Sequence, residues 1–113
     1  MRGMRLSAAI AQGMAKYRLS KRAFADIVGI GEYTIERFDI DQARRYRERL
    51  DDALQAIADN PNRGRPADEI APGLRRWNYQ SHAVFFRLEA RGILIVRVLH
   101  QQMDFERHPM SDE

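Results

Sequence analysis

The spacing of apolar residues changes twice along this chain, and the changes separate a helical part from extended parts. Residues 15–19 alternate as a short strand does, and Ser20 follows as a helix N-cap able to accept from the Ala23 amide. From Lys21 the apolar residues fall three or four apart, which predicts one long amphipathic helix. Its apolar stripe, which we expect to lie mostly in the core, consists of Phe24, Ile27, Val28, Gly31, Ile35 and Phe38.

The first predicted helix contains two glycines, Gly29 and Gly31, each of which costs about 1 kcal/mol in helix propensity. We therefore expect a neighbouring backbone to approach the helix closely at these positions. Asp39 or Asp41 can cap a second helix over residues 42–59. So short a break between two helices predicts an antiparallel helical hairpin. The inward positions of the second helix are Ala43, Tyr46, Leu50, Ala53 or Leu54, and Ile57, and its outer face, with Asp51 and Asp52, is expected to be solvated.

The loop at 60–66, rich in Pro, Asn and Gly, ends the helical part, and after Gly73 the apolar period falls to two. Strands are predicted at 74–79, 82–88 and 93–99, joined by tight turns into an antiparallel meander. The last strand is apolar at nearly every position, so we expect it to be central and covered on both faces. The order β-α-α-β-β-β predicts an α+β fold, with a helical hairpin packed on a small antiparallel sheet.

Composition limits the organisation and the chemistry. A length of 113 residues fits one domain, which we place at 15–108, with an N-terminal extension at 1–14 and a polar tail at 109–113. There is no cysteine, which excludes disulfides, thiolate zinc sites and cysteine nucleophiles. The apolar stretch near the N-terminus is short for a secretory signal, so we expect a cytoplasmic protein.

Charge is unevenly distributed. Residues 72–108 hold six Arg and three acids, a net charge of +3, whereas residues 41–71 hold six Arg and seven acids, a net charge of −1. The C-terminal third is therefore expected to attract an acidic partner or nucleic acid. Of the 19 basic residues, 17 are arginine, a bias that the codon usage of a GC-rich genome would also produce.

Histidines and arginines are the candidate chemical groups. Cationic side chains with a base near a 2′-hydroxyl can cleave RNA, and Arg75, Arg87, Arg97 and His100 could share one face of the sheet. The alternative for His100 is a structural bond to the C-terminal turn, which we favour. The separations of His82, His100 and His108 fit no compact ligand motif, so we expect no metal and no cofactor.

Arg97 lies inside the last predicted strand and is expected on the face opposite Val96 and Val98. There it either pairs with an acid such as Asp104 or Glu106 or contacts a target. The tail is expected to dock Met103 and Phe105 on the sheet beside Arg97 and His100. The aromatic residues of the strands, Trp77, Tyr79, Phe85 and Phe86, alternate as core residues do, and Trp77 is the best candidate for an exposed anchor. The candidate partner-binding residues are Arg75, Arg76, Trp77, Arg87, Arg97, His100, Phe105 and Arg107.

Short pieces of the sequence, in order over about four-fifths of the chain, are similar to those of one family. They include Tyr17-Arg18-Leu19-Ser20, Gln42-Ala43-x-x-Tyr46, Asn60-Pro61, Pro72-Gly73-Leu74-Arg75 and Ile95-Val96-Arg97-Val98-Leu99-His100. In these pieces the chain resembles the RelE/ParE superfamily of type II toxins, and it looks closest to the ParE branch. The extension at 1–14 lies outside the resemblance.

The resemblance implies a toxin that inhibits DNA gyrase, has no catalytic residues and no membrane or sequence-specific nucleic-acid partner. It also implies a ParD-like antitoxin whose C-terminal part lies in a groove along the helices and the sheet. The alternative is a RelE-type ribosome-dependent mRNA endonuclease. Such sites are denser in lysine and arginine, whereas the sheet region here has no lysine. A third possibility is a protein of this fold that has lost its toxicity.

Overall fold

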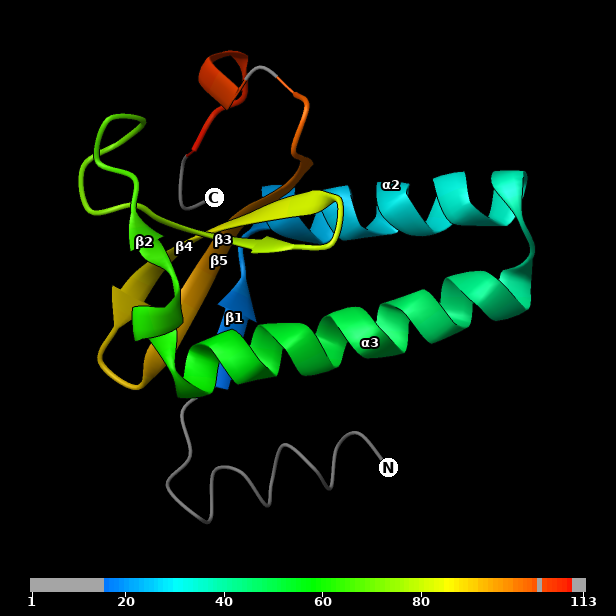
Figure 1. Cartoon of the computed structure of the whole chain (residues 1–113), viewed down its shortest axis with the longest axis horizontal. Helices are drawn as coiled ribbons and strands as arrows, with labels where there is room; N and C mark the ends of the chain where they lie inside the picture. Colours follow the sequence, from blue (N-terminus) through cyan, green and yellow to red (C-terminus); the bar gives the residue numbers. More distant parts are fainter. Residues whose placement is uncertain (1–15, 104, 111–113) are drawn as a thin grey trace.

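The computed structural model describes residues 16–103 and 105–110, and the expected extension at 1–14 lies outside them. Figure 1 shows two long helices extending side by side from a small twisted sheet. The helices are α2 (Lys21–Arg37) and α3 (Ile40–Asp59), and the long strands are β3 (Arg75–Tyr79), β4 (His82–Glu89) and β5 (Gly92–His100). The shorter elements are β1 (Lys16–Leu19), β2 (Arg65–Pro66), η1 (Pro61–Arg63) and η2 (Phe105–Arg107).

The five strands form one sheet in the order β1-β5-β4-β3-β2. The predicted α+β class, the helical hairpin and the antiparallel meander of the last three long strands are confirmed. The sheet as a whole is mixed, because β1 pairs with β5 in parallel. The two-residue strand β2, which pairs with β3, was not predicted, since a pair of residues has no detectable period.

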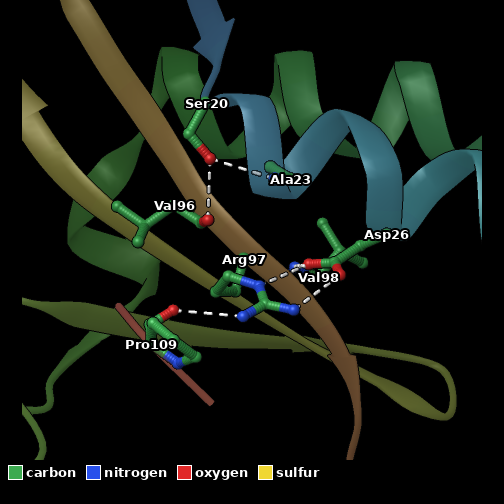
Figure 2. A network of polar contacts seen from close by, with 7 residues as sticks. All are labelled: Ser20, Ala23, Asp26, Val96, Arg97, Val98 and Pro109. Atoms are coloured by element: carbon green, nitrogen blue, oxygen red, sulfur yellow. Dashed lines mark hydrogen bonds and ion pairs between the residues drawn. The ribbon is translucent and has the colours of Figure 1, made fainter. Parts of the chain in front are cut away.

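Both helix starts are capped as the sequence predicts. The Ser20 hydroxyl accepts a hydrogen bond from the Ala23 amide at 3.0 Å and donates one to the Val96 carbonyl at 2.9 Å, as Figure 2 shows. It therefore fixes the start of α2 to the central strand. Asp39, one of the two candidates, caps α3 by accepting from the Gln42 amide at 2.7 Å.

The core has two parts, one on each face of the sheet. The helices cover one face, where Leu50, Leu54 and Ile57 of α3 pack with Phe86 and Ile95. The other face carries a second cluster, in which the segment after β2 and the C-terminal residues take part: Ala67, Leu74, Ala83, Phe85, Leu94, Val96 and Leu99, with Phe105 and Met110 packed against them. The prediction that β5 is central and buried on both faces is confirmed, because Ile93 through Leu99 are all buried.

An irregularity in the pairing of β4 and β5 changes the expected orientation of Arg97. Phe85 pairs with Arg97 and Phe86 with Ile95, so Val96 is an extra residue in β5. As a result, Val96 packs in the cluster away from the helices and Val98 in the helix-covered core. The expectation that both valines share the face opposite Arg97 is therefore wrong.

The apolar stripe of α2 is largely exposed, which contradicts its assignment to the core. Ile27 is buried, but Phe24, Val28, Ile35 and Phe38 are 41–62% exposed. For Ile35 and Phe38 the reason is visible in Figure 1, where the far ends of the helices extend well beyond the sheet. Phe24 and Val28 lie in the turns of α2 next to the sheet, where Ala23 and Ile27 are the buried residues instead. The predicted backbone neighbour of the two glycines is also absent among the described residues. A Cβ added at Gly29 or Gly31 would meet no atom within 4 Å.

Asp51 also differs from its prediction as a solvated carboxylate. It is buried, and its Oδ1 accepts from the Tyr17 hydroxyl at 3.3 Å and from Nε of Arg47 at 3.0 Å. The reason is that α3 packs against β1 at this turn. A helical period cannot show this, because β1 comes from a separate part of the chain.

Candidate partner-binding groove

An open groove of about 980 Å³ lies between the two helices and the end of the sheet. We call it the helix groove. Its walls are α2 and α3, and its end is formed by the β3–β4 turn and the last residues of β5. The lining residues are Ala25, Asp26, Gly29, Ile30, Tyr33, Thr34, Phe38, Gln42, Arg45, Tyr46, Arg49, Gln80, Ser81, His82, Val98, Leu99, His100 and Met103.

The helix groove combines an apolar lining with positive charge. Arg45 and Arg49 lie one turn apart on α3, and within the described residues neither guanidinium has an ion-pair partner. Asp26 is the only carboxylate among the lining residues, and it is bound to Arg97. Such a surface is suited to a partner that carries both apolar side chains and carboxylates.

Two imidazoles and a phenol meet at the sheet end of the helix groove. His82 and His100 face each other across β4 and β5, with ring centroids 5.8 Å apart. The Tyr46 hydroxyl lies 3.0 Å from Nδ1 of His82. Burial, followed by the neighbouring Tyr79, raises the pKa of Tyr46 to about 12. Burial, followed by the neighbouring His100, lowers the pKa of His82 below its usual value.

His100 also has the structural role that the sequence favours. Its Nδ1 accepts a hydrogen bond from the Gln102 amide at 3.2 Å, which holds the turn after β5. The side chain itself is exposed and lines the helix groove. A structural bond and contact with a partner are therefore compatible at this residue.

Arg97 forms the main ion pair of the described fold (Figure 2). Its Nε and Nη2 each donate to Asp26 of α2 at 2.8 Å, and Nη1 donates to the Pro109 carbonyl at 3.1 Å. The Val98 amide donates to the same carboxylate at 3.0 Å. The hydrogen bond from Arg97 to Asp26 is the main cause that raises the pKa of Arg97. Of the two alternatives for Arg97, pairing is the one observed, and the acid is Asp26 of α2, which packs against β5; the acids named from the sequence, Asp104 and the side chain of Glu106, lie outside the described part of the chain.

Two further candidate arginines, Arg75 and Arg87, lie on opposite faces of the sheet. Arg75 donates to the Gly64 carbonyl at 2.6 Å, and Arg87 donates to the Pro72 carbonyl. Arg75 lies opposite Phe86, which is in the helix-covered core, whereas Arg87 lies opposite Leu94 in the second cluster. The expectation that Arg75 and Arg87 share one face of the sheet is therefore wrong.

Two candidates, Arg76 and Phe105, meet on the face of the sheet away from the helices. The Arg76 guanidinium lies 4.7 Å from the centre of the Phe105 ring, which itself packs edge-on against Phe85 at 4.9 Å. Burial is the main cause that lowers the pKa of Arg76. The C-terminal residues thus dock on the sheet through Phe105, whereas Met103 is 42% exposed and lines the helix groove.

Trp77 and Arg107 complete the candidate set. Trp77 is half-buried against the helix-covered core and stacks on Tyr79 with ring centroids 6.0 Å apart. The guanidinium of Arg63 lies 5.6 Å from the centre of the Trp77 ring. The prediction that Trp77 belongs to the core is confirmed for the part of the side chain that packs against the helix-covered core. Arg107 is exposed in η2.

Of the candidates, the structure brings only His100 to the lining of the helix groove. Sequence reasoning missed Arg45, Tyr46, Arg49 and His82 as a group. A signal was present in α3, where two arginines at i and i+4 flank an inward-facing tyrosine. The prediction that the outer face of this helix is solvated, with the two arginines on it, concealed that signal.

Among residues 16–103 and 105–110, no group of three His, Asp or Glu side chains is arranged to hold a metal ion. No helix in the described part of the chain is both long enough and apolar enough to span a membrane.

The fold is shared with a solved structure titled "Chromosomal ParDE TA system from P. aeruginosa". The match has a TM-score of 0.66 and 18% sequence identity, and it covers 78% of this chain and 97% of that chain. The match shows the fold, a helical hairpin packed on a small mixed sheet.

Sequence comparison gives the family. Residues 17–105 match the model of the ParE toxin of type II toxin–antitoxin systems, parDE. The chain is 41% identical over 95 residues to Toxin ParE1 of Mycobacterium tuberculosis, covering 83% of this chain and 97% of the relative. It is 40% identical to Toxin ParE1 of Caulobacter vibrioides, with 84% and 98% covered, and 33% identical to Toxin ParE of Escherichia coli, with 80% and 89% covered. The chain therefore belongs to the ParE toxin family.

Proposed function

We propose that this ParE toxin acts in the cytoplasm by binding and inhibiting DNA gyrase, without catalysing a reaction, and that a ParD-like antitoxin neutralises it. The observation that carries the proposal is the match to Toxin ParE1 proteins over 97–98% of their length. The family model matches residues 17–105, a range that includes every residue lining the helix groove.

The state of the arginines supports a binding role over RNA cleavage. Arg75, Arg87 and Arg97 each donate to an oxygen of the protein itself. To stabilise a phosphate in a transition state, each would first have to break that bond. Preorganised free cations beside a base are the requirement of an endonuclease, and these three side chains do not meet it.

Two surfaces suit an antitoxin with an acidic, apolar C-terminal part. One is the exposed stripe of α2, with Phe24, Val28 and Ile35, and the other is the helix groove, with Arg45 and Arg49. None of these three stripe residues lines the groove, so two separate segments of the antitoxin would occupy the two surfaces, an apolar one on the stripe and an acidic one in the groove. Binding in this way would cover apolar side chains of α2 that are exposed in the free toxin.

The test of the target compares two assays on the same purified protein. We expect inhibition of gyrase-catalysed supercoiling, and intact ribosome-bound mRNA in a translation extract. Codon-specific cleavage in the extract, abolished by His100→Ala, would instead establish the endonuclease alternative.

The test of the antitoxin co-expresses the toxin with a ParD-like antitoxin and purifies the complex. A ligand at a hundred times its Kd stabilises the folded state by about 2.7 kcal/mol, so the complex should melt at a higher temperature than the free toxin. Equal melting temperatures, together with no binding to the free toxin, would contradict this part of the proposal.

A further inference from the structure

The two histidines of the helix groove are both held in hydrogen bonds that suit the neutral imidazole. The raised pKa of Tyr46 keeps its hydroxyl protonated, so it can donate to Nδ1 of His82. The Gln102 amide donates to Nδ1 of His100. In each ring Nδ1 then acts as the acceptor, which leaves the proton of the neutral ring on Nε2.

The surroundings of His82 explain why its charged form lacks support in the free protein. The groups around it are Tyr46, Arg45 and Arg49 from α3, Tyr79 from β3 and His100 from β5, and none of them is an anion at neutral pH. Asp26 of α2 lines the same groove, but Arg97 and the Val98 amide already bind its oxygens. An imidazolium at His82 would thus be half-buried beside His100, without a counter-ion among the residues that line the groove.

We propose that the helix groove binds an acidic peptide segment with uptake of one proton at His82. The inference rests on the proposed function, in which the antitoxin supplies that segment, and it adds how the binding depends on pH. The incoming carboxylate provides the missing counter-ion and accepts a hydrogen bond from Nε2. The proton comes from solvent and binds Nδ1, and the Tyr46 hydroxyl then accepts from Nδ1 instead of donating to it.

This proton uptake determines whether affinity rises or falls with pH. The free protein holds His82 neutral, and the bound carboxylate favours its charged form. Binding therefore strengthens as pH falls through the range between the pKa of His82 in the complex and its pKa in the free protein. One proton limits the change to about tenfold in affinity per pH unit. Arg45 and Arg49 stay charged throughout this range, so their attraction for the ligand is independent of pH.

The experiment measures the affinity of a short, rhodamine-labelled peptide of glutamate and leucine by fluorescence anisotropy at pH 8, 7 and 6. Glutamate is ionised throughout this range, so the peptide charge is constant. We expect the affinity to rise about three- to tenfold from pH 8 to pH 6. A matched peptide with glutamine in place of glutamate should show no such rise.

Three variants show which side chain causes the pH dependence of peptide affinity. His82→Gln should bind with little dependence on pH, because glutamine can accept from Tyr46 but takes up no proton. Arg49→Gln should bind more weakly at every pH while keeping the wild-type slope. His108→Gln, which removes a histidine that does not line the groove, should behave as the wild type.

A second readout does not depend on any variant. The NMR titration midpoint of the His82 ring should lie below 6.5 in the free protein and move upward when the glutamate peptide is added. Wild-type binding that is flat with pH, a pH slope that persists in His82→Gln, or a peptide that does not bind at all would each overturn the inference. If gyrase inhibition is intact in the same preparation, the proposed function stands. Proton-linked binding without gyrase inhibition would overturn the proposed target alone.

Discussion

The ion pair between Asp26 and Arg97 allows a quantitative test of what holds α2 on the sheet. The two side chains are only 12% and 10% exposed, and the carboxylate accepts three hydrogen bonds, two from Arg97 and one from the Val98 amide. Asp26→Asn keeps the size of the side chain but removes its charge. It leaves a nearly buried guanidinium without a counter-ion.

Removing one partner of a buried ion pair costs about 3–5 kcal/mol, because the other charge remains desolvated. A little solvent reaches this pair, so we expect a loss near the lower end, about 3 kcal/mol in the free energy of unfolding. For a domain of this size, each kcal/mol shifts the melting temperature by about 4 °C, which gives a decrease of roughly 12 °C.

Urea unfolding followed by circular dichroism measures this loss, with the slope of the transition as a check that unfolding stays two-state. The double variant Asp26→Leu with Arg97→Met is the informative control. It removes both charges, so it should recover much of the stability lost in Asp26→Asn. A loss below about 1 kcal/mol in Asp26→Asn, the size of an ordinary surface pair, would refute the reasoning.

Four further predictions concern the rest of the fold. Phe105→Ala should destabilise the protein by about 2 kcal/mol, measured by urea unfolding, because the ring covers Phe85 while staying partly exposed. Deletion of residues 103–113 should cost about 3–5 kcal/mol and should weaken toxicity more than it weakens folding. A truncated protein that is folded and fully toxic would contradict a role of the tail in toxicity. Because the pKa of His82 is lowered in the folded state, the unfolded chain binds more protons, so stability should be complete above about pH 6.5 and fall as pH decreases below it; His82→Gln should remove this part of the pH dependence of the urea midpoint. Gly31→Ala should stabilise the free toxin by about 0.5–1 kcal/mol, since open space surrounds the new methyl group, and a lower melting temperature would show a contact that the structure lacks.

The features that the sequence could predict depend on neighbours along the chain. Ser20 and Asp39 cap their helices because a cap requires only the next few residues. The burial of β5 was likewise predictable, since an unbroken apolar run needs cover on both faces. The family resemblance added the arrangement of these elements, which spacing alone does not give.

The features that were missed depend on contacts between distant segments. The helix groove joins Arg45 and Arg49 to His82 and His100, and no period in one helix shows that a strand more than thirty residues later ends beside it. The exposure of Ile35 and Phe38 has the same origin, because periodicity shows that a helix has an apolar face but not how far the sheet extends beneath it. The extra residue in β5 changed the face of Val98, since one inserted residue reverses an alternation of period two.

The most direct test of the central claim is a titration of gyrase-catalysed supercoiling with this protein at a fixed gyrase concentration well above the expected Kd. An inhibitor that acts by binding should reduce the initial rate in proportion to the toxin added and reach its minimum at a fixed molar ratio, independent of preincubation time once binding is complete. Prior addition of the antitoxin should restore the rate in the same proportion. Undiminished supercoiling at molar excess of a folded toxin would contradict inhibition of gyrase, and progressive inactivation by substoichiometric toxin would contradict inhibition by binding.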